Sequence, residues 1–338
     1  MLAGGVWAQE KGETAAARVE SPGSGPVVDL HPKWTVGDVT VYEYELLSNA
    51  YARIGEDESK KSGQLYKQMG RLARRVVSAD ESGVTLSLRF ERLYLQSAVG
   101  TSVMYYDSAD GDAPAKVNQL TEPTRACLAR EIIVRLDPEG EVVSVTGNEN
   151  PEGGAAGGNT IARVPQSVLG ETMVKKMWRP LYRLDKPGLT ARVGETWTTH
   201  DESSDPQRGT FRTALHHELR SAANGVAIIA ATADVEHTPA TGPAAMRATL
   251  RDHTVTGEFE WDLVRGNLRS WTTSQEMRLD VDRAGARAVM GSKVTTKFQR
   301  ADVAKEKAEA ARAAREAEEA KMPKATMGPD GKPVPAGP

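Results

Sequence analysis

The most suggestive chemistry in this chain is that of a metal site, where histidines stand beside acidic residues. His217 and Glu218 begin like the helix motif of zinc proteases, but Ser221 stands where that motif needs its second histidine. Without that histidine the two-nitrogen chelate cannot form. In a strand, His216 and His217 would point to opposite faces and could not share one ion. We therefore predict no metal site here, and we expect His200 and the two acids after it to form a solvated polar loop.

A cluster of aspartates is the next candidate for ligand binding. Asp107, Asp110 and Asp112 surround Gly111. Calcium prefers such oxygen ligands, but the spacing differs from that of an EF-hand loop. Short acidic stretches with glycine are also common in exposed turns. We expect a solvated acidic turn.

A glycine pattern resembles the skeleton of a phosphate-binding loop. Gly153 and Gly158 have the required separation, but Asn159 replaces the lysine that reaches the terminal phosphates. The surrounding sequence does not alternate strands with helices. The pattern therefore favours a flexible linker over residues 151–160.

Nucleophilic catalysis finds little support among the residue types. Cys127 is the one cysteine, so no intramolecular disulfide can form, and a lone thiol is usually a small buried hydrophobe. The sequence contains no G-x-S-x-G elbow and no S-x-x-K motif. We predict no catalytic residues and no cofactor. Carboxylates are plentiful, so a glycosidase-like acid pair stays open as an alternative.

Composition excludes two classes of partner. The chain has 338 residues and a formal net charge of -3, with no basic excess to neutralise a phosphate backbone, which argues against nucleic-acid binding. No apolar run approaches the roughly 18 residues of a membrane-spanning helix. Hydrophobic residues make up 39% of the chain and charged residues 26%, as in a globular protein.

The first residues resemble the end of a signal peptide. Residues 2–9 are small and mostly apolar, and Val6 and Ala8 would occupy positions -3 and -1 of a cleavage site before Gln9. We interpret residues 1–8 as a signal-peptide remnant and residues 9–30 as a flexible lead-in. The expected location is then periplasmic or extracellular. An ordinary disordered terminus is the alternative interpretation.

Alternating residues predict strands through the first half, residues 31–150. From Val39 to Leu46, β-branched and aromatic side chains alternate with a period of two. Further strand-like segments cover residues 65–78, 84–95 and 102–106. Turns are predicted at residues 80–83 and 137–140, where Gly83 and Gly140 suit a left-handed backbone.

The second half, residues 185–301, repeats this order. Residues 193–197 (Val-Gly-Glu-Thr-Trp) echo residues 36–40, and the turn at 222–225 precedes a strand as the turn at 80–83 does. A third turn, at 264–266, corresponds to the one at Gly140. These echoes indicate two related halves. Two unrelated meanders with similar turn residues are the alternative.

Two segments are predicted to be helical. In residues 161–184, Leu169, Met173 and Met177 are spaced four apart, and Pro180 should end the helix. Such a stripe would pack on a sheet or form a lid over a cavity, and we assign these three residues as candidate ligand-binding residues. Within residues 302–338, alanine and opposite charges at helical spacing predict a solvated helix followed by a disordered tail.

Several short motifs are similar to those of an uncharacterised family of exported bacterial β-rich proteins. They are Val36-Gly37-Asp38, the turn at 80–83, Tyr106-Asp107-Ser108 and the Val-Gly-Glu-Thr-Trp segment. The resemblance covers roughly residues 34–300 and implies no catalytic residues. More distantly, the order of elements resembles the open half-barrels that carry lipids or lipoprotein tails across the bacterial envelope.

The sequence thus predicts an all-β fold with one or two helices: a curved antiparallel sheet, as a half-barrel or two packed sheets. The first functional hypothesis is a non-catalytic exported binding or carrier protein for an apolar ligand such as a lipid or acyl chain. The second is an envelope structural or interaction protein that contacts another envelope protein through its charged C-terminal helix. The third is a hydrolase with a carboxylate site.

Overall fold

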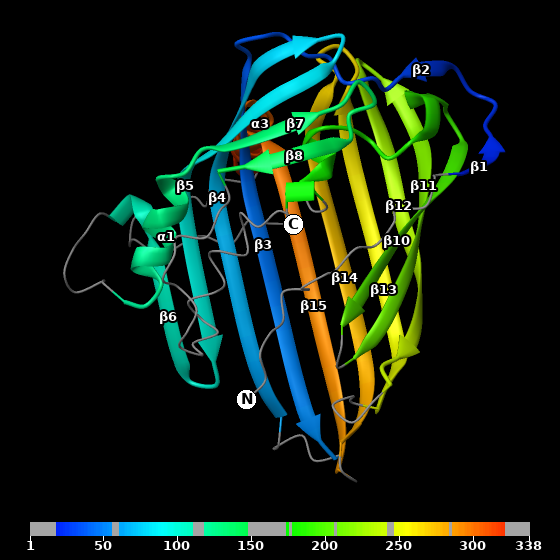
Figure 1. The fold of residues 1–338 in the computed structure, drawn as a ribbon. Coiled ribbons are helices and arrows are strands. Elements are labelled where there is room, and N and C mark those ends of the chain that lie inside the picture. The colour runs from blue at the N-terminus through cyan, green and yellow to red at the C-terminus, as the bar shows by residue number, and fades with distance from the viewer. Residues whose placement is uncertain are drawn as a thin grey trace, which may run out of the picture. The chain divides into compact units, whose positions relative to one another are not determined.

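A computed structural model describes residues 18–55, 61–110, 118–147, 174–175, 178–205, 208–241, 247–283 and 286–321. Within these residues, the main feature is a 13-stranded antiparallel sheet (Figure 1). The predicted all-β class is confirmed, and of the two predicted arrangements the chain adopts one continuous open sheet, because strands from both halves follow a single path. The strand order is β1-β10-β11-β12-β13-β14-β15-β3-β4-β5-β7-β8, with β6 paired to β5.

Long strands from both halves build the sheet. The first half supplies β3 (Val39–Ile54), β4 (Lys61–Asp80), β5 (Gly83–Val99), β6 (Ser102–Asp107), β7 (Ile132–Leu136) and β8 (Val142–Thr146). The second half supplies β10 (Glu195–Asp205), β11 (Gly209–Ala223), β12 (Val226–Pro239), β13 (Arg247–Asp262), β14 (Asn267–Arg283) and β15 (Ala286–Arg300).

The two halves meet where β15 pairs with β3. The pairing is continuous from Ala288 opposite Ile54 to Arg300 opposite Tyr42. The last strand of the second half therefore lies beside the first strand of the first half, and neither meander is a separate sheet. We call this pairing the seam.

Matching details occur at corresponding places in the two halves. The register shifts just after Val76 in β4 and just after Leu219 in β11. The backbone N–H of Gly37 donates to the carbonyl of Val76 at 2.9 Å, and that of Gly194 donates to the carbonyl of Leu219 at 2.8 Å. The segment before each half's first strand is thus attached at the same point of its second strand.

The predicted turn glycines adopt the expected backbone. Gly140 has φ of 82° and Gly225 has φ of 76°, and Asn224 before it has φ of 54°. Two successive positive φ values match the type I′ turn that joins twisted strands. The hairpin between β11 and β12 therefore has the local chemistry that the Asn-Gly pair predicts.

Three local expectations need correction. Part of the expected flexible lead-in is ordered, because β1 (Arg18–Pro22) pairs with β10 and β2 (Val27–Asp29) pairs with β9 (Thr190–Arg192). A short helix that the sequence did not indicate, α1 (Thr121–Leu128), packs on β5. Pro180 lies inside a 3-10 turn, η5 (Arg179–Leu181), which continues past it to Leu181, and most of the helix predicted before Pro180 lies outside the described residues.

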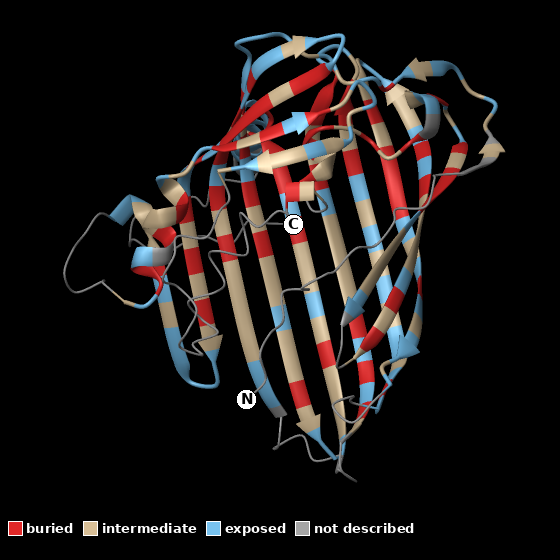
Figure 2. Ribbon diagram, viewed as in Figure 1, coloured by how far each residue is buried: buried red, intermediate tan, exposed pale blue. Residues whose placement is uncertain are grey.

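Two apolar clusters form the core. The larger one includes Trp178, Trp197 and Trp261 and draws on both halves. The smaller one consists of Phe211, Val235, Ala248, Met277, Leu279 and Val281. Figure 2 shows that buried positions gather toward the end of the sheet where β7 and β8 lie, whereas intermediate exposure is common along the middle of the long strands.

The C-terminal unit is a helix, α3 (Ala301–Lys321), as predicted. Ion pairs at helical spacing join Lys305 to Glu309 at 3.9 Å and Arg312 to Glu316 at 2.7 Å. Every residue from 305 to 316 is exposed. The predicted tail from Met322 lies outside the described residues.

Candidate functional site

The three candidate ligand-binding residues predicted from the sequence, Leu169, Met173 and Met177, lie outside the described residues. Their described neighbours Val174 and Trp178 are both 0% exposed. The ring of Trp178 meets Phe90 of β5 edge-on, at 5.8 Å between centroids. These described residues of the predicted helical segment therefore pack against the core, and the candidate site has to be built from the sheet.

The sheet has two chemically different faces. We define the inner face as the one to which Tyr42, Tyr44 and Leu46 of β3 point, and the outer face as the opposite one. Directly paired residues of antiparallel strands lie on the same face. The register therefore follows the inner face from Leu46 to Gln68 of β4 in one direction and to Thr296 of β15 in the other.

Charge separates the two faces along the middle of the sheet. Within residues 42–52, 62–72, 271–281 and 288–298, no inner-face position carries an Asp, Glu, Lys or Arg. The outer-face positions of the same segments carry charges of both signs, which are Glu43, Glu45, Lys67, Arg71, Glu276, Arg278, Asp280, Lys293 and Lys297. Charged side chains favour water strongly. The outer face is thus suited to solvent, and the inner face of these strands is not.

A row of aromatic rings crosses the inner face. Trp271 of β14 stacks on Phe298 of β15 at 5.4 Å, and Phe298 lies 4.7 Å from Tyr44 of β3, between centroids. On the other side, Phe259 of β13 stacks on Trp271 at 5.9 Å. The row continues to His217 of β11, 6.1 Å from Phe259. Aromatic side chains thus line the inner face across the seam.

Beyond the aromatic row the inner face is only half-buried. One register row holds Val255, Gln275, Val294, Ser48 and Tyr66, all of intermediate exposure. Past that row, Met277 and Leu279 belong to the smaller apolar cluster. An uncharged, partly accessible strip therefore lies between two buried regions.

Polar groups without partners stand next to this strip. The amide oxygen of Gln68 accepts a hydrogen bond from the Tyr66 hydroxyl at 3.1 Å. Among the residues that the structure describes, the Gln68 amide nitrogen, the Tyr44 hydroxyl and the Trp271 indole nitrogen have no hydrogen-bond partner, although all three atoms are buried. Buried polar atoms are nearly always paired in proteins. Gln68 was not predicted from the sequence. The pattern that could have indicated it is an uncharged polar residue at a position of β4 that faces inward.

The Val-Gly-Glu-Thr-Trp segment at the start of β10 binds the chain that precedes it. Glu195 accepts from Lys186 at 2.7 Å and from the Arg192 backbone N–H at 2.8 Å. The Trp197 indole donates to the Asp185 carbonyl at 2.8 Å, and Lys186 lies over its ring. The Lys186 and Glu195 side chains are 3% and 9% exposed. This motif therefore holds the 185–192 segment against β10, which is a structural role.

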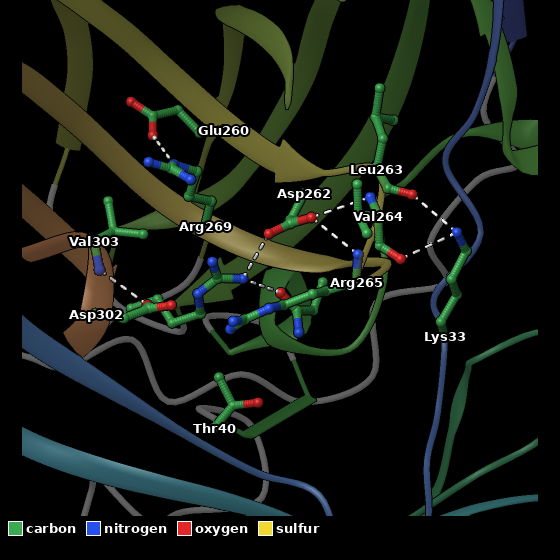
Figure 3. Close-up of polar contacts among 12 residues, drawn as sticks. Lys33, Thr40, Glu260, Asp262, Leu263, Val264, Arg265, Arg269, Asp302 and Val303 are labelled. Carbon is green, nitrogen blue, oxygen red and sulfur yellow. Dashed lines mark hydrogen bonds and ion pairs between the residues drawn. The ribbon is translucent and has the colours of Figure 1, made fainter. Parts of the chain in front are cut away.

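A second buried ion pair organises the turn between β13 and β14. Asp262 accepts from Arg300 at 2.9 Å and from the backbone N–H groups of Val264 and Arg265 (Figure 3). Burial acts to raise the pKa of Asp262, but the Arg265 N–H and the Arg300 guanidinium more than offset it and lower that pKa. Lys33 donates to the carbonyls of Leu263 and Val264. This carboxylate is thus engaged in shaping the turn.

The histidines lie as the strand geometry predicts. His217 points inward, stacks on Trp197 at 5.3 Å, and contacts the Thr199 hydroxyl at 3.2 Å. His216 points outward between the Thr198 hydroxyl at 2.8 Å and Asp234 at 3.0 Å. Among the described residues no group of three or more potential ligands could hold a metal ion.

The Thr-His-Asp arrangement on the outer face has the residue types of a hydrolase triad. Thr198 is 3% exposed, however, so its hydroxyl offers a substrate little access. The order of the ring nitrogens also differs, because Nδ1 faces the hydroxyl and Nε2 the carboxylate, the reverse of the serine-protease arrangement. We assign this trio to cross-strand pairing.

The other chemically suggestive residues have structural surroundings. Cys127 is buried on α1, and burial raises the pKa of its thiol to about 11, which keeps it protonated and poorly nucleophilic. In the acidic turn, Asp107 pairs with Arg92 at 2.7 Å and accepts the backbone N–H of Ala109. Gly111 and Asp112 lie outside the described residues. His200 is exposed.

A shallow hollow of about 240 Å³ lies on the outer face. Its walls include acids and bases from neighbouring strands, such as Glu43, Glu45, Arg92 and Lys297. Opposite charges at such short range neutralise one another, and water screens them. The hollow does not single out a ligand.

In the part of the chain that the structure describes, no helix is both long and apolar enough to cross a membrane.

Comparison with known proteins shows no family. No family model matches the chain, and no curated protein matches it. Solved structures with similar strand arrangements include lipovitellin, which shares 12% identity over 79% of this chain and has a TM-score of 0.43. This chain spans only 25% of the lipovitellin chain.

Two further solved structures are more distant. DynF from the dynemicin biosynthesis pathway of Micromonospora chersina shares 8% identity over 87% of this chain and 95% of its own, with a TM-score of 0.18. An outer membrane channel from Pseudomonas putida F1 shares 9% identity over 79% of this chain and 97% of its own, with a TM-score of 0.21. At these sequence identities and TM-scores, the three structures do not indicate a function for this chain.

Proposed function

We propose that this chain is an exported, non-catalytic binding or carrier protein that holds an apolar ligand, such as a lipid or acyl chain, against the inner face of its sheet. The observation that supports this most is the uncharged strip beyond the aromatic row, where apolar side chains such as Val255 and Val294 stay half-exposed. Exported location is part of the proposal because of the cleavage pattern at Val6 and Ala8.

The physical reason is the cost of leaving such a surface in water. Burying apolar surface is favourable by about 25 cal/mol per Å². An uncharged surface on which apolar side chains stay half-exposed is a suitable place for an apolar ligand to bind. The polar residues in the strip are Ser48, Tyr66 and Gln275, and losing contact with water costs these neutral groups much less free energy than it costs a charged group. An apolar chain lying along this strip would therefore be stabilised with little electrostatic cost.

Consecutive residues of β15 provide a matched test. Val294 faces inward and Thr295 faces outward, and both are half-buried. Native mass spectrometry of the purified wild type should detect co-purifying lipid, and bis-ANS should bind with enhanced fluorescence. Val294→Glu should abolish lipid retention and weaken bis-ANS binding at least about tenfold, because a desolvated carboxylate is costly.

Thr295→Glu is the control, since it adds the same charge to the solvated face, and it should keep both properties. Circular dichroism of both variants would verify that the sheet is intact. Absence of lipid and of bis-ANS binding in the wild type, or equal losses in the two variants, would contradict an inner-face site.

A further inference from the structure

The unpaired donors beside the strip indicate which end of a ligand binds there. The Tyr44 hydroxyl and the Gln68 amide nitrogen come from neighbouring strands of the inner face, and their side chains are 3% and 0% exposed. Leaving a buried donor without a partner costs roughly 1–3 kcal/mol, so such groups in native proteins call for an explanation. A ligand that brings acceptor oxygens would supply one.

The register brings the two donors together. Gln68 is paired with Leu46, and Tyr44 is paired with Gly70, so Tyr44 and Gln68 are diagonal neighbours. Diagonal neighbours in a sheet lie about 7–8 Å apart. Gly70, opposite Tyr44, has no side chain of its own, and the Phe90 ring lies 3.1 Å from where its Cβ would be.

Neighbouring groups fix both side chains as donors. The Gln68 amide oxygen is already occupied by the Tyr66 hydroxyl, at 3.1 Å, which leaves the amide nitrogen free. Burial raises the pKa of Tyr44, so its hydroxyl keeps its proton. Burial first, and then Tyr44 and Cys127, also raise the pKa of Tyr66. The cluster therefore consists of neutral groups with two free donors.

The cluster lies next to the half-exposed strip. Tyr66 belongs to the same register row as Ser48 and Val294, and all three are of intermediate exposure. Its hydroxyl is bonded to Gln68 and so connects the strip to the donors. An acyl chain along the strip would bring its polar end to Tyr44 and Gln68.

The charge of the surroundings selects the kind of acceptor. Of the inner-face cations, Arg300 is paired with Asp262 and hydrogen-bonded to Asn267. Arg74 donates to Thr40 and to the Leu181 carbonyl, and it lies four residues along β4 from Gly70, about 13 Å by strand rise, which places its charge away from Tyr44 and Gln68. A carboxylate or phosphate would therefore be desolvated without a counter-charge, which is unfavourable. A neutral carbonyl oxygen accepts two hydrogen bonds without that cost.

We propose that Tyr44 and Gln68 bind the carbonyl oxygen of an esterified acyl chain, an assignment that rests on the carrier function proposed above. The ligand class is a neutral acyl ester, and the two residues determine specificity for it. Tyr66 positions the Gln68 amide.

Three probes of equal chain length test the assignment: methyl laurate, dodecane and laurate, each displacing bis-ANS. The wild type should bind methyl laurate at least about tenfold more tightly than dodecane, since each of the two hydrogen bonds contributes up to about a tenfold difference, and more tightly than laurate, whose charge would be desolvated. Gln68→Leu and Tyr44→Phe should each remove most of the preference for the ester over dodecane and leave dodecane binding unchanged.

The control variant is Gln64→Leu, on the same strand and the same face but half-exposed and outside the cluster. It should keep the wild-type preference. Tyr44→Phe removes a single oxygen atom, so it still tests the assignment if Gln68→Leu fails to fold. Failure of all three probes to bind the wild type would reject the carrier function itself. Binding of the probes with equal affinity, tighter binding of laurate, or an ester preference retained by both variants would overturn this assignment while leaving the carrier function standing.

Discussion

At the scale of single residues, the inner face keeps an ionisable group in its neutral form. His217 lies in the aromatic row between Trp197 and Phe259. Burial first, and then the neighbouring His216, lower the pKa of His217 to about 4. An unfolded chain would have an ordinary histidine pKa near 6.5. The unfolded state therefore binds a proton at mildly acidic pH that the folded state does not bind.

This difference predicts a stability loss on acidification. Between the two pKa values the unfolded state holds more protons, so the free energy of unfolding rises with pH and falls as pH drops from about 6.5 to about 4. From pH 7.5 to pH 5 the loss due to His217 should be about 2 kcal/mol. His217→Gln, which keeps a hydrogen bond to Thr199 within reach, should show a smaller loss by about that amount. Urea titrations of both proteins at the two pH values would measure the difference, and parallel pH dependences would refute it.

The opposite orientations of His216 and His217 could be predicted from the sequence, because alternation is a property of any strand. The unpaired donors of Tyr44 and Gln68 could not be predicted in this way. Gln68 and Gln64 have the same residue type on the same strand and the same face, yet only Gln68 is fully buried. What distinguishes them is the neighbouring strands, and a single sequence does not reveal which strands those are.

At the scale of elements, tight turns fix which residues face each other. Gly140 and Gly225 both have positive φ, which costs a residue with a Cβ roughly 1 kcal/mol or more. A Cβ on Gly140 would lie 3.3 Å from the Arg183 side chain, and one on Gly225 would lie 3.2 Å from Val264. Gly140→Val and Gly225→Val should therefore each destabilise by roughly 1–3 kcal/mol.

Alanine at the same positions should cost less, because β-branching restricts the left-handed region further. Thermal or urea unfolding of the four variants would test the order. If neither valine substitution changes the stability, the two hairpin assignments are wrong. If only one of them destabilises the protein, the result contradicts the view that the two halves are related.

The sequence predicted strands and turns well because their signals are local. It missed α1 because the segment 121–128 is short and has a proline at its third position, and its helical state depends on packing against β5. It missed β1 and β2 because residues 18–29 have few apolar side chains and gain their order by pairing with β10 and β9. In both cases a distant partner decides the local structure.

At the scale of the whole molecule, the C-terminal unit can be tested for its contribution to stability. In α3, Val303 is fully buried, whereas residues 305–316 are all exposed. A chain ending after Ala304 should therefore unfold within about 0.5 kcal/mol of the full chain, as expected for loss of solvated surface helix. A loss beyond about 2 kcal/mol in urea titrations would show that the exposed helix contributes to folding. The sequence alone placed this boundary between residues 301 and 302.

The seam makes both halves one folding unit. Phe298 of β15 is 0% exposed and contacts Tyr44 across the seam and Trp271 on its own side. The larger core cluster contains residues of both halves. Phe298→Ala should therefore cost about 3–5 kcal/mol, the usual range for removing a buried ring, and should destabilise both halves together. Lys297→Ala, on the exposed outer face beside it, should change stability by less than about 0.5 kcal/mol.

Each half contains its own reporter for this test. Cys127 is the one cysteine and is buried in the first half, while Trp197, Trp261 and Trp271 lie in the second half; the measurement uses a Trp34→Phe background to remove the tryptophan of the first half. Pulsed thiol labelling and tryptophan fluorescence should give coincident unfolding transitions in wild type and in Phe298→Ala, with the midpoint lowered equally in both. Separate transitions would mean that the halves fold independently and that the seam joins two units already formed. Coincidence is expected because neither half can bury its inner face alone, since Tyr44 of the first half and Phe298 of the second cover each other.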